Sequence, residues 1–245
     1  MITVCLLNWK RPRNLRRIID RLGEQTLRPT IFLWNNSPET FEHPAVDWQV
    51  DSSRNMLCPP RWWMAARART PWVASLDDDL LPADRRVLAD AVTVADAQPA
   101  ERAIGPFGVN LRPGRPYFPH DNVRCPPCDT PVDLVLGRCL IVRAGALRRA
   151  LRLADLNAYY DHGRGDDMAV CGALAGGRRR RHLVPGMFRG RFRELPVGRE
   201  GLEHHPSHAG GREAARKHWF PEHGSKRCQA PFAGTARGVL RTKGA

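Results

Sequence analysis

Residues 72–81 read WVASLDDDLL, and this stretch decides the fold. Residues 72–76 form an apolar run of strand length, which predicts a buried β-strand. Asp77, Asp78 and Asp79 follow directly at its carboxyl end. Three consecutive carboxylates repel one another, and after an apolar strand they are costly unless a cation neutralises them. The stretch therefore predicts a strand that ends in a site for positive charge.

Short apolar runs alternate with segments of helical spacing on both sides of this stretch. The expected strands cover residues 2–7, 30–34, 48–50, 72–76, 103–109, 137–142 and 182–184. The expected helices cover residues 13–22, 60–69, 82–97, 144–153, 166–175 and 211–219. Residues 110–131 are rich in proline and predict a long loop. The alternation predicts an α/β fold with a mostly parallel central sheet flanked by helices.

Polar residues follow several of the expected strands. Asn8, Asn35 and Arg54 each come after one, as do the three aspartates after residue 76. Ligands of open parallel sheets bind at the carboxyl ends of the strands. We therefore expect all of these side chains on one rim of the sheet.

The aspartate triplet has two interpretations. Mg²⁺ or Mn²⁺ prefers oxygen ligands, accepts nucleotide phosphates as partners and would neutralise a leaving diphosphate. Otherwise the triplet is a solvated acidic turn or a helix cap. Its place between an apolar strand and a proline-opened helix favours the metal site. The chain has neither GxGxxG after the first strand nor GxxxxGK[ST], which argues against a dinucleotide-binding Rossmann domain and a P-loop.

The chain is strongly basic. Its formal net charge is +14, from 39 Lys and Arg against 25 Asp and Glu. Such a field suits an anionic ligand, and a nucleoside diphosphate, an anionic membrane surface and a nucleic acid all qualify. The run from Arg178 to Arg181 fits a phosphate patch or, slightly better, a solvated face.

Length and apolar patterning limit the class of protein. The 245 residues suit a single domain. No stretch approaches the ~18 consecutive apolar residues of a membrane span, and the opening MITVCLLNWKRP lacks the features of a signal peptide. We expect a cytoplasmic protein, with the inner face of the membrane as a candidate peripheral contact. Cys125 and Cys128 lie among prolines without a second pair, so a loop is favoured over a redox or zinc motif.

Seven segments together resemble the GT-A glycosyltransferases, and among them the family 2 and exostosin-like (family 64) enzymes. They are TVCLLNWKRP (3–12), IFLWNNSPE (31–39), SSRNM (52–56), WVASLDDDLL (72–81), GRCLIVRAGAL (137–147), GRGDDMAVCGAL (163–174) and SHAGGREAARKHWF (207–220). The resemblance covers residues 2–220. Asp166 stands where those families usually have Glu, and the order Arg54-Asn55 is reversed relative to them.

The resemblance implies a GT-A fold in residues 1–223 as one catalytic domain. Residues 1–100 would form the nucleotide-sugar-binding half and residues 101–223 the acceptor half. Residues 224–245 would be a disordered basic tail.

The resemblance also implies an activity. The enzyme would transfer a sugar from a nucleotide-diphosphate sugar, a UDP-sugar first, to a hydroxyl of a glycan, lipid or protein acceptor, with Mn²⁺ or Mg²⁺. In an inverting enzyme Asp167 would be the general base, and in a retaining enzyme it would stabilise the reacting centre; both remain open.

The implied site has three parts. Asp167 would be the catalytic carboxylate, supported by Asp166. Asp77, Asp79 and His208 would bind the metal. The donor-binding residues would be Asn8, Arg11, Asn35, Arg54, Asp77, Asp78 and Arg212.

Two other classes compete with this interpretation. A metal-dependent nucleotidyltransferase would carry a glycine-rich loop after the first strand, where this chain has NWKRPRN. A basic nucleic-acid-binding protein would explain the charge of +14 but not the aspartates at a strand end. We therefore expect no nucleic-acid partner.

Overall fold

The computed structural model describes residues 1–112, 114–117, 121–154, 165–197 and 208–220. The strands are β1 Ile2–Asn8, β2 Thr30–Asn35, β3 Trp48–Asp51, β4 Trp72–Leu76, β5 Leu80–Pro82, β6 Phe107–Asn110, β7 Asp121–Arg124, β8 Thr130–Val132, β9 Leu134–Val135, β10 Cys139–Arg143, β11 His182–Val184 and β12 Phe192–Glu194. The helices are α1 Pro12–Gly23, α2 Pro60–Arg67, α3 Val87–Asp96, α4 Ala144–Leu153, α5 Asp166–Ala175 and α6 His208–Trp219, with a short 3₁₀ turn η2 at Gly186–Phe188.

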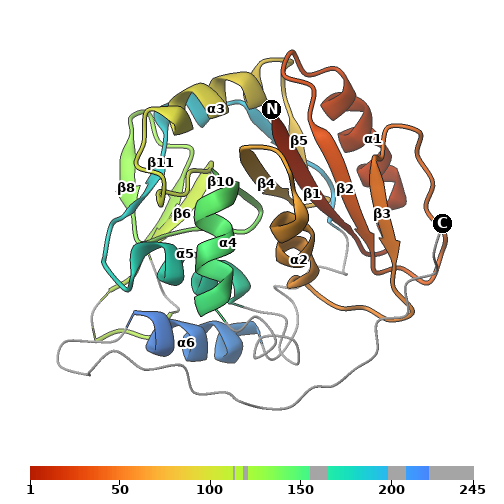
Figure 1. Ribbon diagram of the computed structural model, residues 1–245. Coiled ribbons are helices and arrows are strands. Elements are labelled where there is room, and N and C mark those ends of the chain that lie inside the picture. The colour runs from red at the N-terminus through yellow and green to blue at the C-terminus, as the bar shows by residue number, and fades with distance from the viewer. Residues whose placement is uncertain (113, 118–120, 155–164, 198–207, 221–245) are drawn as a thin grey trace.

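The central sheet has the order β10-β4-β1-β2-β3 (Figure 1). The strands β1 to β4 are parallel, and β10 joins the edge antiparallel to β4. The expected α/β fold with a mostly parallel sheet is therefore confirmed. Because β1 to β4 run the same way, their carboxyl ends meet along one rim, as the sequence predicts for Asn8, Asn35 and the aspartates.

Both faces of the sheet are buried, which explains why its strands read as apolar runs rather than alternating ones. Ile2, Val4 and Leu6 of β1 face a core shared with α1 and α3. Cys5, on the opposite face of β1, belongs to a second core shared with α2, α4 and α5. Every residue of α5 is buried. The helices that carry candidate site residues thus pack on one face of the sheet.

Short strands outside the central sheet correct two expectations. The helix predicted over residues 82–97 begins only at Val87, because Leu80–Pro82 form β5 and pair with β12. The predicted loop over residues 110–131 contains β7, which pairs with β6, and the start of β8, which pairs with β11. Local periodicity does not reveal β5 and β8, because their partner strands are distant in sequence.

Two further expectations concern membrane spans and the C-terminal segment. Within the described part of the chain, no helix combines the length and apolar character needed to cross a bilayer. The tail expected at residues 224–245 lies outside the described residues.

Candidate active site

At the ends of β1 and β2, a hydrogen-bond relay orients two buried asparagines. Asp51 accepts a bond from Asn35 Nδ2 at 2.9 Å, and Asn35 Oδ1 accepts one from Asn8 Nδ2 at 2.8 Å. A carboxylate only accepts, so Asp51 fixes the orientation of both amides. Asn8 Oδ1 is left buried without a hydrogen-bond partner in the described part of the chain. Such a group calls for a donor, which a ligand N–H could supply.

Each carboxylate of the aspartate triplet is paired with an arginine from a different part of the chain. The ion pairs are Arg61–Asp77 at 2.7 Å, Arg11–Asp78 at 2.7 Å and Arg138–Asp79 at 3.2 Å. The protein itself thus supplies three cations to the triplet, where the sequence interpretation assigned this role to a metal ion.

These arginines do not balance the triplet completely. Burial raises the pKa of Asp78 to about 7, although Arg11 acts in the opposite direction. Burial and the neighbouring charge of Asp77 also raise the pKa of Asp79. Among the described residues, no three His, Cys, Asp or Glu side chains are grouped as a metal site. Burial and mutual repulsion thus still disfavour the charged forms of Asp78 and Asp79, and a further cation would stabilise them.

Arg61 connects the triplet to the acidic pair at the start of α5. Its Nη1 contacts Asp77 and donates a 2.6 Å bond to the carbonyl oxygen of Gly137. Its Nε lies 3.6 Å from Asp166 Oδ2. The side chain is buried in α2, so two acidic motifs that are far apart in sequence meet on one guanidinium.

Asp166 is the carboxylate with the raised pKa. Its Oδ2 accepts a 2.6 Å hydrogen bond from Trp62 Nε1. Burial raises its pKa to about 6, while Arg61 acts in the opposite direction. Gly165, at a φ of 91°, occupies the N-cap position of α5, and Asp166 and Asp167 follow in the first turn of the helix.

Asp167 is bonded through both oxygens. Arg212 contacts Oδ1 at 3.1 Å and Oδ2 at 3.2 Å. The backbone N–H of Met168 donates to Oδ1 and that of Gly137 to Oδ2. Burial raises the pKa of Asp167, but Arg212 and the Gly137 N–H outweigh it and hold the pKa below its ordinary value. Asp167 is thus a stable carboxylate in a buried ion pair.

Arg212 projects from α6 and is only 8% exposed. Its guanidinium lies 4.7 Å from the centroid of the Tyr117 ring. His208 begins α6, but its side chain lies outside the described residues. Arg54 is exposed on the turn after β3, where its carbonyl oxygen accepts a bond from Ser52. The predicted residues that the structure joins in one network are Arg11, Asp77, Asp78, Asp79, Asp166, Asp167 and Arg212.

The sequence interpretation missed several side chains of this network. Arg138 pairs with Glu194 at 2.8 Å as well as with Asp79, and it stacks on Phe107 at 4.9 Å. Arg61 and Trp62 were also missed, although a charged residue on the buried face of an apolar helix is a signal that could have been read.

Comparisons with known proteins find a similar fold at low identity. No protein-family model and no curated protein matches the chain. Similar solved structures include S. aureus TarS, at 14% identity and a TM-score of 0.47 over 75% of this chain and 34% of that one. A mannosyltransferase from Pyrobaculum calidifontis in complex with GDP-Man and Mn²⁺ gives 16% identity and 0.47 over 76% and 56%. TarS 1-349 in complex with UDP-GlcNAc gives 13% and 0.48 over 76% and 56%.

The mannosyltransferase is a glycosyltransferase, the class that the sequence resembles. The chain spans 34% to 56% of the length of these proteins. With TM-scores of 0.47 and 0.48, these similarities do not bear on function. A functional proposal must come from the geometry of the site.

Proposed function

We propose that the protein is a glycosyltransferase that moves a sugar from a nucleoside-diphosphate sugar to an acceptor hydroxyl. The observation that carries the proposal is the contact of one buried arginine with both acidic motifs. Arg61 lies 2.7 Å from Asp77 and 3.6 Å from Asp166. This contact groups the aspartate triplet, in which Asp78 and Asp79 have raised pKa values, with a further carboxylate of raised pKa at the strand-end rim, where α/β sheets bind ligands.

The first candidate for the donor is a UDP-sugar, and it would lie along this rim. The unpartnered Asn8 Oδ1 supports a base with a ring N–H, which uracil has, and Asn35 holds Asn8 in that orientation. Arg11 and Arg54 are cations on loops after β1 and β3, suited to the diphosphate. The Arg212 Nε is buried without a partner among the described residues, so a phosphate contact for Arg212 remains part of the proposal.

The proposed metal is Mn²⁺ or Mg²⁺. Arg61 and Arg138 contact Asp77 and Asp79 through Oδ1, and within the described residues neither Oδ2 atom has an ion pair, so both could bind another cation. Mg²⁺ sites commonly use one or two carboxylates plus substrate phosphates, so this pair fits, with His208 as a further proposed ligand. A bound divalent cation would neutralise the charge of the leaving diphosphate.

The catalytic role belongs to the acidic pair, and the geometry supports Asp166 as the proton acceptor. A general base works best with a pKa near the working pH, and the pKa of Asp166 is raised to about 6. Asp167 is bonded through both oxygens to Arg212, Gly137 and Met168, and its pKa is lowered. The sequence favours the opposite division between the two acids, so both must be tested.

Two substitutions separate donor binding from catalysis. Asp79→Ala should lose nucleotide affinity as well as transfer. Asp166→Asn should keep donor affinity and lose transfer by ~10²–10⁴-fold, the usual contribution of a general base. Donor affinity by calorimetry and transfer or hydrolysis rates with a panel of nucleotide sugars measure both effects. Near wild-type transfer by Asp166→Asn would remove its catalytic role.

Asp167→Asn needs a stability control. It leaves the buried Arg212 without its anion, and breaking such a pair costs about 3–5 kcal/mol. A folded Asp167→Asn protein with normal donor affinity but no transfer would instead return the catalytic role to Asp167.

A further inference from the structure

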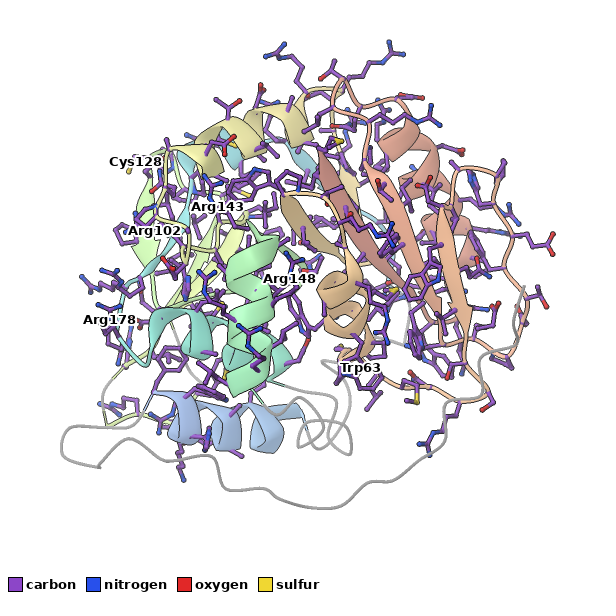
Figure 2. All side chains as sticks on the ribbon, in the orientation of Figure 1. Trp63, Arg102, Cys128, Arg143, Arg148 and Arg178 are labelled. Atoms are coloured by element: carbon purple, nitrogen blue, oxygen red, sulfur yellow. The ribbon has the colours of Figure 1, made fainter. Side chains whose placement is uncertain are left out.

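Four exposed arginines gather where α2 and α4 lie side by side. They form what we call the α2–α4 face: Arg67, Arg69, Arg148 and Arg152. Arg148 reaches from α4 across to α2 and donates a 3.0 Å hydrogen bond to the carbonyl oxygen of Ala68, between the first two arginines in sequence. Figure 2 shows Arg148 on the side of α4 that faces α2. Arg152 follows one helical turn later on α4.

In the described part of the chain, no acidic residue compensates the charge of the α2–α4 face. Neither residues 52–76 nor residues 134–154 contain an Asp or Glu. Among the described residues, no carboxylate lies within ion-pair distance of its four guanidinium groups. Arg149, on another side of α4, pairs with Glu101 at 3.0 Å. As far as the described residues go, the positive charge of this face is available to an external anion.

Apolar side chains accompany this charge. Leu153, at the end of α4, is 65% exposed, and only it and Met1 are exposed large hydrophobics in the described part of the chain. Leu151 and Trp63 of the same two helices are half-buried. A single exposed leucine is ordinary on a protein surface. Leu153 follows Arg152 directly, so the α2–α4 face and the adjoining end of α4 together have the two features of a membrane-surface helix.

We propose that the α2–α4 face docks on an anionic lipid surface. The arginines would contact lipid phosphates, and Leu153 would enter the boundary between headgroups and acyl chains. A nucleic acid fits less well, because its phosphates offer nothing apolar to Leu153. The inner side of α2 carries Arg61 and Trp62 of the candidate active site, so docking would bring that site next to the lipid. Vesicle binding needs no substrate, and its failure leaves the proposed reaction untouched.

Vesicle flotation with the full chain tests the proposal. Phosphatidylcholine vesicles containing phosphatidylglycerol should bind the protein, and pure phosphatidylcholine vesicles should not. Each arginine near such a surface contributes about fivefold in affinity, so Arg148→Ala with Arg152→Ala should weaken binding about 25-fold. Leu153→Ser should weaken binding while its dependence on salt stays that of the wild type.

The control variant removes the same charge elsewhere. Arg178→Ala with Arg181→Ala changes exposed arginines after α5, and Figure 2 shows Arg178 at the left edge of the molecule, with α4 between it and α2. This variant should lose much less affinity than the α4 variant. Equal losses in the two variants, or equal binding to both vesicles, would overturn the proposal. So would an α4 variant that loses affinity for duplex DNA but keeps its affinity for anionic vesicles. Unchanged melting temperatures exclude unfolding, and Leu153→Ser tests the face independently.

Discussion

Arg61 is the residue on which the two acidic motifs meet. It binds Asp77 and the Gly137 carbonyl and lies near Asp166. Buried ion pairs stabilise little by themselves, because desolvation offsets the attraction. The partners of each carboxylate do set its pKa. Burial outweighs Arg61 and raises the pKa of Asp166, whereas Arg212 and the Gly137 N–H outweigh burial and lower the pKa of Asp167. The difference between two adjacent acids is a property of their partners.

The pKa of Asp166 predicts the pH dependence of transfer. A general base acts in its ionised form, so kcat should fall as the pH drops through about 6, the raised pKa of this carboxyl. The measurement is kcat at saturating donor and metal, because protonation of Asp78 and Asp79 would also weaken metal binding. A rate that stays constant down to a pH of about 4.5 would contradict the role of Asp166.

Asp78 predicts a pH dependence of stability. Its pKa rises from 3.8 to about 7 on folding, with burial as the main cause. A carboxyl whose pKa is higher in the folded state lowers stability as the pH rises between these two values. Asp78→Asn lacks this titration. The melting temperature of the variant minus that of the wild type should therefore increase as the pH rises from about 5 to about 8.

A surface variant controls for the loss of a carboxylate. Asp96→Asn removes a carboxylate from an exposed ion pair with Arg143. It should show no such gain. A difference in melting temperature between Asp78→Asn and the wild type that does not change with pH would mean that the Arg11 ion pair offsets the effect of burial on the pKa of Asp78.

At the scale of elements, the sequence predicts best where one segment carries its own pattern. Strand Trp72–Leu76 and helices Ala144–Leu153 and Asp166–Ala175 have the expected bounds. Strands β5 and β12 were missed, because three residues carry no periodicity and the two strands lie far apart in the sequence. Pro82 therefore closes a strand, whereas the sequence interpretation has it opening a helix.

The same limit applies to the candidate site. Parallel strands align their carboxyl ends, so the rule for α/β sheets predicts a common rim for Asn8, Asn35 and the aspartates. No such rule predicts that Arg61 and Arg138 would pair with Asp77 and Asp79, since ion pairs between distant segments depend on tertiary packing. The roles assigned by resemblance to these aspartates remain proposals.

The packing of α6 on α5 predicts the effect of a single methyl group. A Cβ added at Gly172 would lie 2.6 Å from Trp219 Cβ, which is too close without movement of α6. Gly172→Ala should therefore destabilise the protein by about 1–3 kcal/mol, as overpacking does. It should also loosen the Arg212–Asp167 pair that joins the two helices.

Gly145→Ala is the matched control. A Cβ at Gly145 in α4 would lie 3.8 Å from the Arg149 guanidinium, an ordinary contact. This variant should keep or slightly raise the melting temperature, because Ala favours a helix over Gly. Chemical denaturation of both variants measures the difference, and equal stability would mean that α6 adjusts without cost.

At the scale of the whole molecule, a basic protein surrounds an acidic site. The net charge is +14, yet Asp78, Asp166 and Asp167 are buried near the strand ends. The surface potential alone would attract any polyanion. The buried carboxylates would repel one unless a divalent cation or their own arginines compensated them. Binding of an anion at this site and binding to the surface should therefore differ in their need for metal.

The last prediction uses this difference to separate an enzyme from a nucleic-acid-binding protein. A nucleoside diphosphate should bind only together with a divalent cation, because Asp77 and Asp79 otherwise oppose its phosphates. UDP with Mn²⁺ should then raise stability by about 2.7 kcal/mol at a ligand concentration of 100 times Kd.

Calorimetry and thermal melting with UDP or GDP, with Mn²⁺ or with chelator, measure the effect against duplex DNA as the competing ligand. Asp79→Ala should lose this stabilisation, and Arg178→Ala with Arg181→Ala should keep it, since those arginines are exposed and belong to none of the site's ion pairs. Equal nucleotide binding in chelator would mean that the arginines bind the diphosphate without a metal ion. The aspartates would then have no role as metal ligands. Stabilisation by DNA alone would favour the nucleic-acid-binding class, because surface charge without metal would then suffice for binding.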